Sequence, residues 1–162
     1  MSTLYTLGSQ GKTLAEFIAC LRRAGVDAGV DARVEDGVDD GVDAVIDIRL
    51  HNTSQLAGYT KRDDLAFLLR EGFGIAYEHR LELAPSPEIL EAYRQDQDWP
   101  AYQTRFLPLL SERHAENAGR EILVRYRAPC LLCSEAVADH CHRRLVAEYW
   151  RVFMKELEIV HL

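Results

Sequence analysis

The sequence predicts an α/β fold, in which residues 1–162 form a single three-layer domain with a mostly parallel sheet of about five strands and helices on both faces. Three observations support this prediction. Short apolar, β-branched runs alternate with segments of helical periodicity, as in βαβ units. The chain has 162 residues and is 48% hydrophobic, which is enough for one core and too little for two domains. The run over residues 44–50 is nearly continuously apolar, as a strand covered on both faces requires.

The first strand is expected at residues 4–7 and is followed by a polar turn and a helix. Residues 8–11 read Gly-Ser-Gln-Gly and stop the strand. Thr13 then precedes apolar residues at helical spacing, which end near Gly25, so we expect Thr13 to cap this helix. Ser9 keeps two interpretations, because a small polar turn that enters a helix N-terminus also suits an anion.

Residues 28–43 resemble an acidic inserted loop. A Gly-Val-Asp octapeptide that begins at Gly25 returns at Gly37, and the insertion carries a net charge of −5 out of −7 for the chain. An EF-hand spacing around Gly37 would put Ala32 and Val34 at ligand positions, so calcium binding is not indicated. We expect this loop to be solvated. Because most of the negative charge lies in the loop, the net charge of the chain says little about which partners the rest of the chain binds.

The second strand is expected at residues 44–50 and the third at 75–79, with a helix over 63–70 between them. Asp47 and Arg49 interrupt the second strand at alternating positions. They share a face, so a partly buried ion pair is one interpretation. The polar loop that follows would lie at the carboxyl end of a parallel strand, where functional residues are common.

The second half of the chain supplies the remaining elements. Helices are expected at residues 88–94, 99–113 and 141–155, and strands at residues 130–134 and 158–161, whereas residues 121–126 are ambiguous between a helix end and a strand. The aromatic residues near Tyr102 have helical spacing, which favours core packing over a base-stacking platform. The simplest doubly wound strand order is 3-2-1-4-5.

Ligands of such sheets bind beyond the carboxyl ends of the strands, at the switch point. The candidate ligand-binding residues are Ser9, Arg49, Asn52, Ser54, Gln55, Cys133, Ser134, His142 and Arg143, and the candidate catalytic residues are Glu135, Cys141 and Asp47. Glu135 ends an apolar strand, where burial raises the pKa of a carboxyl group while a nearby arginine lowers it. It acts as an acid, base or nucleophile, or alternatively it orients the arginines.

The cysteines are expected to be reduced thiols. Cys141, at a predicted helix N-terminus beside His142, would have its thiolate stabilised by the helix dipole, so a reactive thiol and a packed thiol both remain open. Cys130 and Cys133 lie three positions apart in one strand and should point to opposite faces, which opposes a closed zinc site. We therefore predict no cofactor and no metal, with an open zinc site at Cys133, Cys141 and His142 as the weaker alternative.

The leading functional hypothesis is an enzyme that binds a phosphorylated or otherwise anionic small molecule, such as a nucleotide. Arg49 and Arg143 would anchor its charge, and Asn52 and Gln55 would orient it. Group transfer or hydrolysis is favoured over redox chemistry, because the sequence has no Gly-rich dinucleotide fingerprint. The alternative is a non-catalytic module that binds nucleic acid or protein through the same arginines.

The predicted location is the cytoplasm, with no membrane partner. No run approaches the ~18 to 20 apolar residues of a membrane-spanning helix. The N-terminal residues also lack the basic and apolar regions of a signal peptide. The oligomeric state is left open by the sequence.

A combination of short motifs resembles the family known as domain of unknown function 488. These motifs are Leu132-Cys133-Ser134-Glu135, Cys141-His142-Arg143-Arg144, Thr6-Leu7-Gly8, Asp47-Ile48-Arg49 and the terminal Ile159-Val160-His161-Leu162. Members of that family typically follow the Asp-x-Arg strand with a proline and a Ser-Arg pair, whereas this chain reads Asn52-Thr53-Ser54-Gln55. The resemblance also implies that residues 28–43 are an insertion, and it implies no particular reaction.

Overall fold

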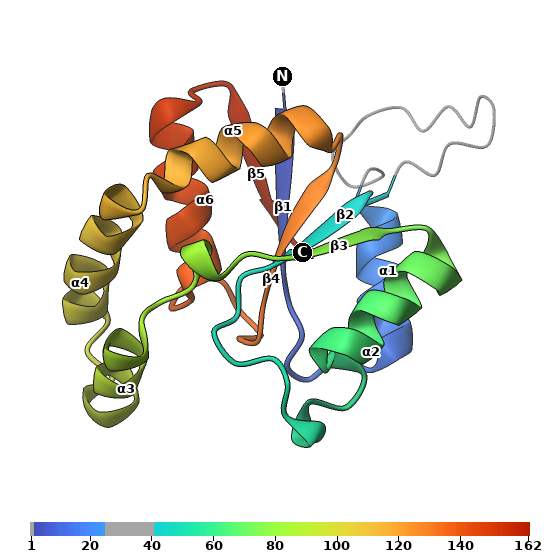
Figure 1. Ribbon diagram of the computed structural model, residues 1–162, viewed down its shortest axis with the longest axis horizontal. Coiled ribbons are helices and arrows are strands. Elements are labelled where there is room, and N and C mark those ends of the chain that lie inside the picture. Colours follow the sequence, from blue (N-terminus) through green and yellow to red (C-terminus); the bar gives the residue numbers. More distant parts are fainter. Residues whose placement is uncertain (1, 25–40) are drawn as a thin grey trace.

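A computed structural model describes residues 2–24 and 41–162, and five strands form one all-parallel sheet in these residues (Figure 1). The strands are β1 (Ser2–Gly8), β2 (Ala44–Asp47), β3 (Ala76–His79), β4 (Pro129–Cys133) and β5 (Leu157–His161). The predicted α/β class with a parallel sheet is confirmed. Most of the predicted acidic insertion, residues 28–40, lies outside the described residues.

The predicted strand order 3-2-1-4-5 is wrong, because the order is β3-β2-β4-β1-β5. Cys130 of β4 pairs with Tyr5 of β1 on one side and with Val45 of β2 on the other. All five residues of β4 are buried. The most apolar strand therefore takes the centre of the sheet, where neighbours on both sides satisfy its backbone groups. As a consequence, the carboxyl ends of β2 and β4 lie side by side.

Within residues 2–24 and 41–162, six α-helices cover the two faces of the sheet (Figure 1). Helices α1 (Leu14–Arg23) and α2 (Arg62–Phe67) pack on one face, and α3 (Pro87–Asp96), α4 (Trp99–Glu112), α5 (Ala115–Arg125) and α6 (His142–Phe153) lie on the other. A π-helical turn, Leu68–Gly72, extends α2, and 3-10 helices span Gln55–Thr60 and Leu81–Leu83. In the part of the chain described here, no helix has the length and apolar character to cross a membrane.

Residues 121–125, which the sequence left ambiguous between a helix end and a strand, form the end of α5, and Tyr126 follows as its C-cap. The predicted helix over residues 99–113 corresponds to α4, but the sequence did not identify α5 as a separate helix. The two helices are separated at His114, whose backbone has a positive φ of 51°. A residue in this left-handed region cannot continue a right-handed helix, so the chain turns before α5 begins.

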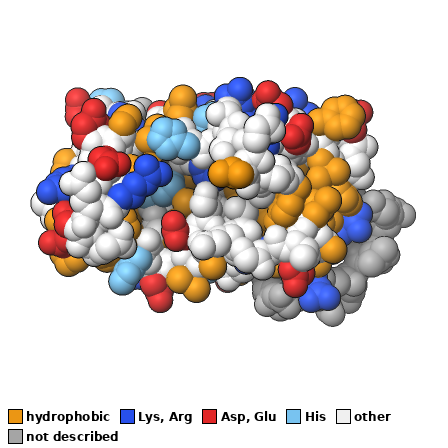
Figure 2. All heavy atoms as spheres, turned by 90° about the horizontal axis from the view of Figure 1, so that it is seen from below, with side chains coloured by type: hydrophobic (Ala, Val, Ile, Leu, Met, Phe, Trp, Pro, Cys, Tyr) orange, Lys and Arg blue, Asp and Glu red, His pale blue; other side chains and the backbone are white. Residues whose placement is uncertain are grey.

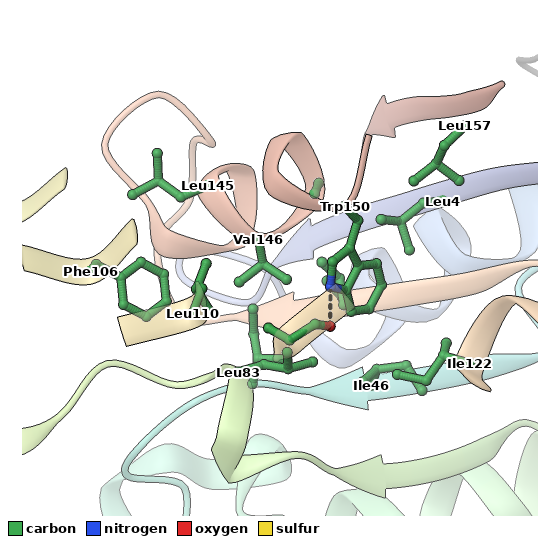
Figure 3. Packing of buried hydrophobic residues seen from close by; sticks show 14 of the residues in the cluster. Leu4, Ile46, Leu83, Phe106, Leu110, Ile122, Leu145, Val146, Trp150 and Leu157 are labelled. Atoms are coloured by element: carbon green, nitrogen blue, oxygen red, sulfur yellow. Dashed lines mark hydrogen bonds between the residues drawn. The ribbon is translucent and has the colours of Figure 1, made fainter. Parts of the chain in front are cut away.

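Trp150 of α6 anchors the larger core cluster (Figure 3). Its Nε1 donates a hydrogen bond of 2.9 Å to the carbonyl oxygen of Ala115. Its ring lies so close to Gly119 that a Cβ at that position would come within 2.7 Å of the ring. This packing fixes α6 against the sheet. Because α6 follows β4 in a βαβ unit, the N-terminus of α6 then lies at the carboxyl ends of the strands.

Candidate functional site

A cavity of about 340 Å³ lies at the carboxyl ends of β2 and β4. From the strand ends and the start of α6 it is lined by Arg49, His51, Cys133, Glu135, Cys141 and His142. A second cavity of about 350 Å³ adjoins it, shares Arg49, His51 and Ser134 with it, and includes Ser9. Strands β1 and β4 run downward in Figure 1, so Figure 2, which is seen from below, looks onto the carboxyl ends of the strands. Basic, acidic and histidine side chains lie close together on the left half of Figure 2.

Asp47 and Arg49 form a fully buried ion pair, as one interpretation of the sequence predicted. Arg49 donates from Nε to Oδ1 of Asp47 at 2.9 Å and from Nη2 to Oδ2 at 2.6 Å. Oδ2 also accepts hydrogen bonds from the Tyr77 hydroxyl and from Asn52. Burial raises the pKa of Asp47, but the hydrogen bonds and charge of Arg49 outweigh burial and hold this pKa below its usual value. Asp47 is therefore an ionised anchor for Arg49.

Arg49 faces the cavities with the part of its guanidinium group that Asp47 does not use. Nη2 also donates to the carbonyl oxygen of Thr60 at 2.8 Å, and the His79 ring nitrogen Nε2 lies 2.9 Å from the carbonyl oxygen of Arg49. Among the described residues, nothing accepts a hydrogen bond from Nη1 of Arg49. Because Arg49 lines both cavities, this nitrogen suits an anionic group of a ligand.

Cys133, Cys141 and His142 form a buried cluster whose potential ligand atoms all lie within 4.8 Å of one another. Nδ1 of His142 is 3.4 Å from Sγ of Cys133, and Nε2 is 2.8 Å from the carbonyl oxygen of Ile48. A carbonyl oxygen only accepts hydrogen bonds, so Nε2 carries a proton. In the neutral imidazole, the lone pair of Nδ1 is then directed at Cys133.

The two thiols of this cluster have shifted pKa values in opposite directions. The hydrogen bond from Cys141, backbone N–H groups of Ser134 and Glu135, and the charge of Arg143 outweigh burial and lower the pKa of Cys133. The hydrogen bond to Cys133, together with burial, raises the pKa of Cys141. Of the two sulfur atoms, Cys133 is therefore the one whose thiolate the surroundings favour, whereas the surroundings of Cys141 disfavour its thiolate.

Arg143 and Glu135 meet through the backbone of Glu135. Nη1 of Arg143 donates to the carbonyl oxygen of Glu135 at 2.6 Å and to Sγ of Cys141 at 3.3 Å, and Nη2 donates to the carbonyl oxygen of Ala136 at 3.3 Å. Arg143 is 1% exposed, and its Nε has no acceptor among the described residues. Arg143 does not line either cavity; it holds the loop after β4, whereas the exposed side chain of Glu135 lines the first cavity.

Gly8 allows β1 to pass directly against this loop. A Cβ at Gly8 would lie 1.7 Å from the carbonyl oxygen of Glu135. The next two residues continue the pairing, since Ser9 donates to the Cys133 carbonyl oxygen at 3.1 Å and Gln10 donates to that of Ser134 at 2.8 Å. The close approach of the two chains requires a residue without a side chain, which explains the glycine at this position.

Besides Arg143, three predicted ligand-binding residues lie away from both cavities. Asn52 is buried and donates to Asp47 at 3.0 Å. Ser54 caps the following 3-10 helix by accepting a hydrogen bond from the backbone of Leu56, and Gln55 is exposed at the start of that helix. The Asn52 amide and the Ser54 hydroxyl, which the sequence suggested as ligand contacts, are therefore used in hydrogen bonds within the protein.

The sequence missed the aromatic wall of the first cavity, which comes from α3, α4 and the loop before α6. Trp99 stacks on Tyr102, with ring centroids 5.1 Å apart, and on His140, with centroids 5.3 Å apart. Tyr93 and Arg94 line the same wall. Tyr102 is 3% exposed and is at once a core and a cavity residue. The available signal was a tryptophan in the first turn of a helix, but helical spacing alone does not separate core from cavity.

The comparison with known families agrees with the motif resemblance. A family model described as Domain of unknown function DUF488 matches residues 34–150, which is more than half of the chain. This range includes the Asp-x-Arg strand, the loop after β4 and most of α6. No curated protein and no solved structure matches the chain.

Proposed function

The chain belongs to the DUF488 family, whose description assigns no activity, and we propose that it is an enzyme that binds a small anionic molecule, nucleotide-like in chemistry, for hydrolysis or group transfer. The observation that carries this proposal is the first cavity, which brings together Arg49, Glu135 and the Cys133–His142 pair. Its volume of about 340 Å³ is in the range of small-molecule sites.

The lining of the cavity supports a ligand with one anionic end and one apolar or planar part. Arg49, Arg94 and three histidines face one acidic side chain, Glu135, so the lining favours negative charge. In the same lining, Trp99 and Tyr93 offer aromatic surface. A phosphate or carboxylate at Arg49 and a ring beside Trp99 would use both parts of the site.

The geometry favours this proposal over a nucleic-acid-binding module. A binding groove for nucleic acid would continue past Arg105 and Arg113 as a basic surface. Arg113 instead donates to the carbonyl oxygens of Glu82 at 3.2 Å and Ala84 at 2.7 Å. Glu135 lies in a concave cavity, where a carboxylate suits proton transfer to or from a bound small molecule.

Ligand binding tests the proposal directly. We expect at least one compound in a panel of nucleoside mono- and triphosphates, pyrophosphate and sugar phosphates to raise the melting temperature. At a concentration of 100 times Kd, binding stabilises the folded state by about 2.7 kcal/mol, which corresponds to roughly 5–10 °C for a chain of this size. Differential scanning fluorimetry and titration calorimetry measure these effects.

Variants connect the binding to the cavity. Arg94→Gln and Trp99→Leu should each weaken the affinity about tenfold or more, because each removes a contact with the ligand. Arg151→Gln, on the exposed side of α6 and away from the cavity, is the matched control and should bind normally. Glu135→Gln should retain binding and lose turnover. A panel without any stabilising anion, or equal losses in the control variant, would contradict the proposal.

A further inference from the structure

We propose that Cys133, Cys141 and His142 bind one zinc ion with a fourth coordination position open to the first cavity. The two sulfur atoms and one ring nitrogen lie within 4.8 Å of one another and all three residues are buried. Two thiolates and one imidazole are a ligand set that favours zinc over the hard cations calcium and magnesium.

The distances fit tetrahedral coordination. With Zn–S and Zn–N bonds of about 2.3 and 2.05 Å, a sulfur and a nitrogen ligand lie about 3.6 Å apart. Sγ of Cys133 and Nδ1 of His142 are 3.4 Å apart. The ligands therefore need only small side-chain adjustments to surround the ion.

The surrounding groups orient the ligands as in known metal sites. His142 donates its Nε2 proton to the carbonyl oxygen of Ile48 at 2.8 Å, which leaves Nδ1 as the coordinating atom. Arg143 donates to Sγ of Cys141 at 3.3 Å, and this hydrogen bond offsets part of the negative charge of the sulfur. Both contacts are made by buried groups.

The position of the cluster indicates an open site. Cys130 belongs to the core cluster on the side of α1 and α2, whereas Cys133 contacts α6 on the other side, so Cys130 is not a fourth ligand. The described residues supply three protein ligands, and all three line the first cavity. Three protein ligands with access to a cavity are typical of catalytic zinc, whereas structural zinc has four.

This metal site deepens the proposed function and, in its catalytic role, rests on it. Zinc at this point would act as a Lewis acid toward an oxygen atom of a ligand held by Arg49. The metal itself depends only on the ligand set. Zinc binding without anion binding would therefore leave the inference standing, and anion binding without zinc would leave the proposed function standing.

The experiment measures metal content and thiol protection in the full chain without a histidine tag. We expect about one zinc per chain by mass spectrometry of the metal after purification or after incubation with zinc. Zinc should protect Cys133 and Cys141 from iodoacetamide, as mapped by peptide mass spectrometry, and a chelator should remove this protection. Less than about one tenth of a zinc per chain, or unprotected thiols, would overturn the inference.

Variants and cobalt substitution identify the ligands. Cys133→Ser and Cys141→Ser should lower the zinc content at least fivefold, whereas Cys20→Ser, a half-buried cysteine outside the cluster, should retain it. Cobalt in the wild-type chain should show tetrahedral d–d absorption and thiolate-to-metal charge transfer, and added azide should shift these bands. Equal losses in Cys20→Ser would overturn the ligand assignment, and cobalt bands that azide leaves unchanged would overturn the open position.

Discussion

At the residue scale, Asp47 shows how a charged side chain becomes part of the core. Its carboxylate is fully buried and accepts five hydrogen bonds, three from Arg49 and one each from Asn52 and Tyr77. Removal of one partner from such a pair is costly, because the other charge stays buried without compensation. Asp47, Asn52 and Tyr77 therefore stabilise the part of the structure that holds Arg49 at the cavity.

The substitution Asp47→Asn should destabilise the protein by about 3–5 kcal/mol at pH 7. The asparagine keeps the shape of the side chain but leaves the guanidinium group of Arg49 buried beside a neutral amide. Urea denaturation followed by circular dichroism measures the loss. Glu91→Gln is the control, because Glu91 is 59% exposed and pairs with Arg94 at 3.9 Å, so its loss should stay within about 0.5 kcal/mol.

The effect of Asp47→Asn should also depend on pH. Folding lowers the pKa of Asp47 below its ordinary value of 3.8. The stability from this group is therefore fully present above pH ~4 and is lost as the pH falls through the lower pKa of the folded state. The difference in unfolding free energy between wild type and Asp47→Asn should be constant from pH 7 to pH 5 and should shrink below pH 4. A difference that stays constant down to pH 2 would contradict this account.

At the element scale, the end of β1 and the loop after β4 are joined by backbone contacts alone. Gly8 lies directly against the Glu135 carbonyl oxygen, which Arg143 also holds. Two further backbone hydrogen bonds, from Ser9 and Gln10, continue this contact past the end of the sheet. The shape of the cavity therefore depends on a strand end that contributes no side chain at its closest point.

The substitution Gly8→Ala should destabilise the protein by about 3 kcal/mol or more, because the added Cβ overlaps backbone atoms that cannot move without loss of hydrogen bonds. The melting temperature should fall by roughly 6–12 °C, as measured by differential scanning calorimetry.

Gly72→Ala is the matched control for this substitution. A Cβ there would meet only Leu68, at an ordinary distance of 3.7 Å. In this helical position alanine should stabilise the chain by about 0.4–1 kcal/mol. A Gly8→Ala variant as stable as the wild type would show that the loop after β4 yields easily, contrary to the packing described here.

At the scale of the whole molecule, several arginines are paired with acidic side chains. Arg80 forms ion pairs with Glu78, Glu82 and Glu121, and Arg125 pairs with two of the same glutamates. These paired arginines do not form the continuous positive surface that holds a phosphate backbone.

We therefore expect no binding of a labelled 20-nucleotide DNA or RNA at protein concentrations up to about 100 µM in 50 mM salt, near the weak limit of non-specific binding. Fluorescence anisotropy measures this, with a basic nucleic-acid-binding protein as the positive control. Saturable binding that weakens with added salt would support the binding module instead of the small-molecule enzyme.

The sequence by itself determined the elements and the end of the sheet at which the site lies. Apolar runs and helical spacing identified all five strands and most helices, because burial on a sheet face and on a helix face leaves different periods in the sequence. The same alternation placed Cys130 and Cys133 on opposite faces. Asp47, Arg49 and Glu135 were singled out because charged residues within or directly after an apolar strand are unusual.

Only the tertiary structure decided which strand lies in the centre and what each polar residue touches. The position of β4 between β1 and β2 depends on which strands pair with one another, and strand pairing produces no local pattern in the sequence. Arg143 holds carbonyl oxygens and Asn52 holds Asp47, whereas Trp99 lines the cavity. These roles depend on residues distant in sequence. The cluster of Cys133, Cys141 and His142 likewise exists only because α6 packs back against the end of β4.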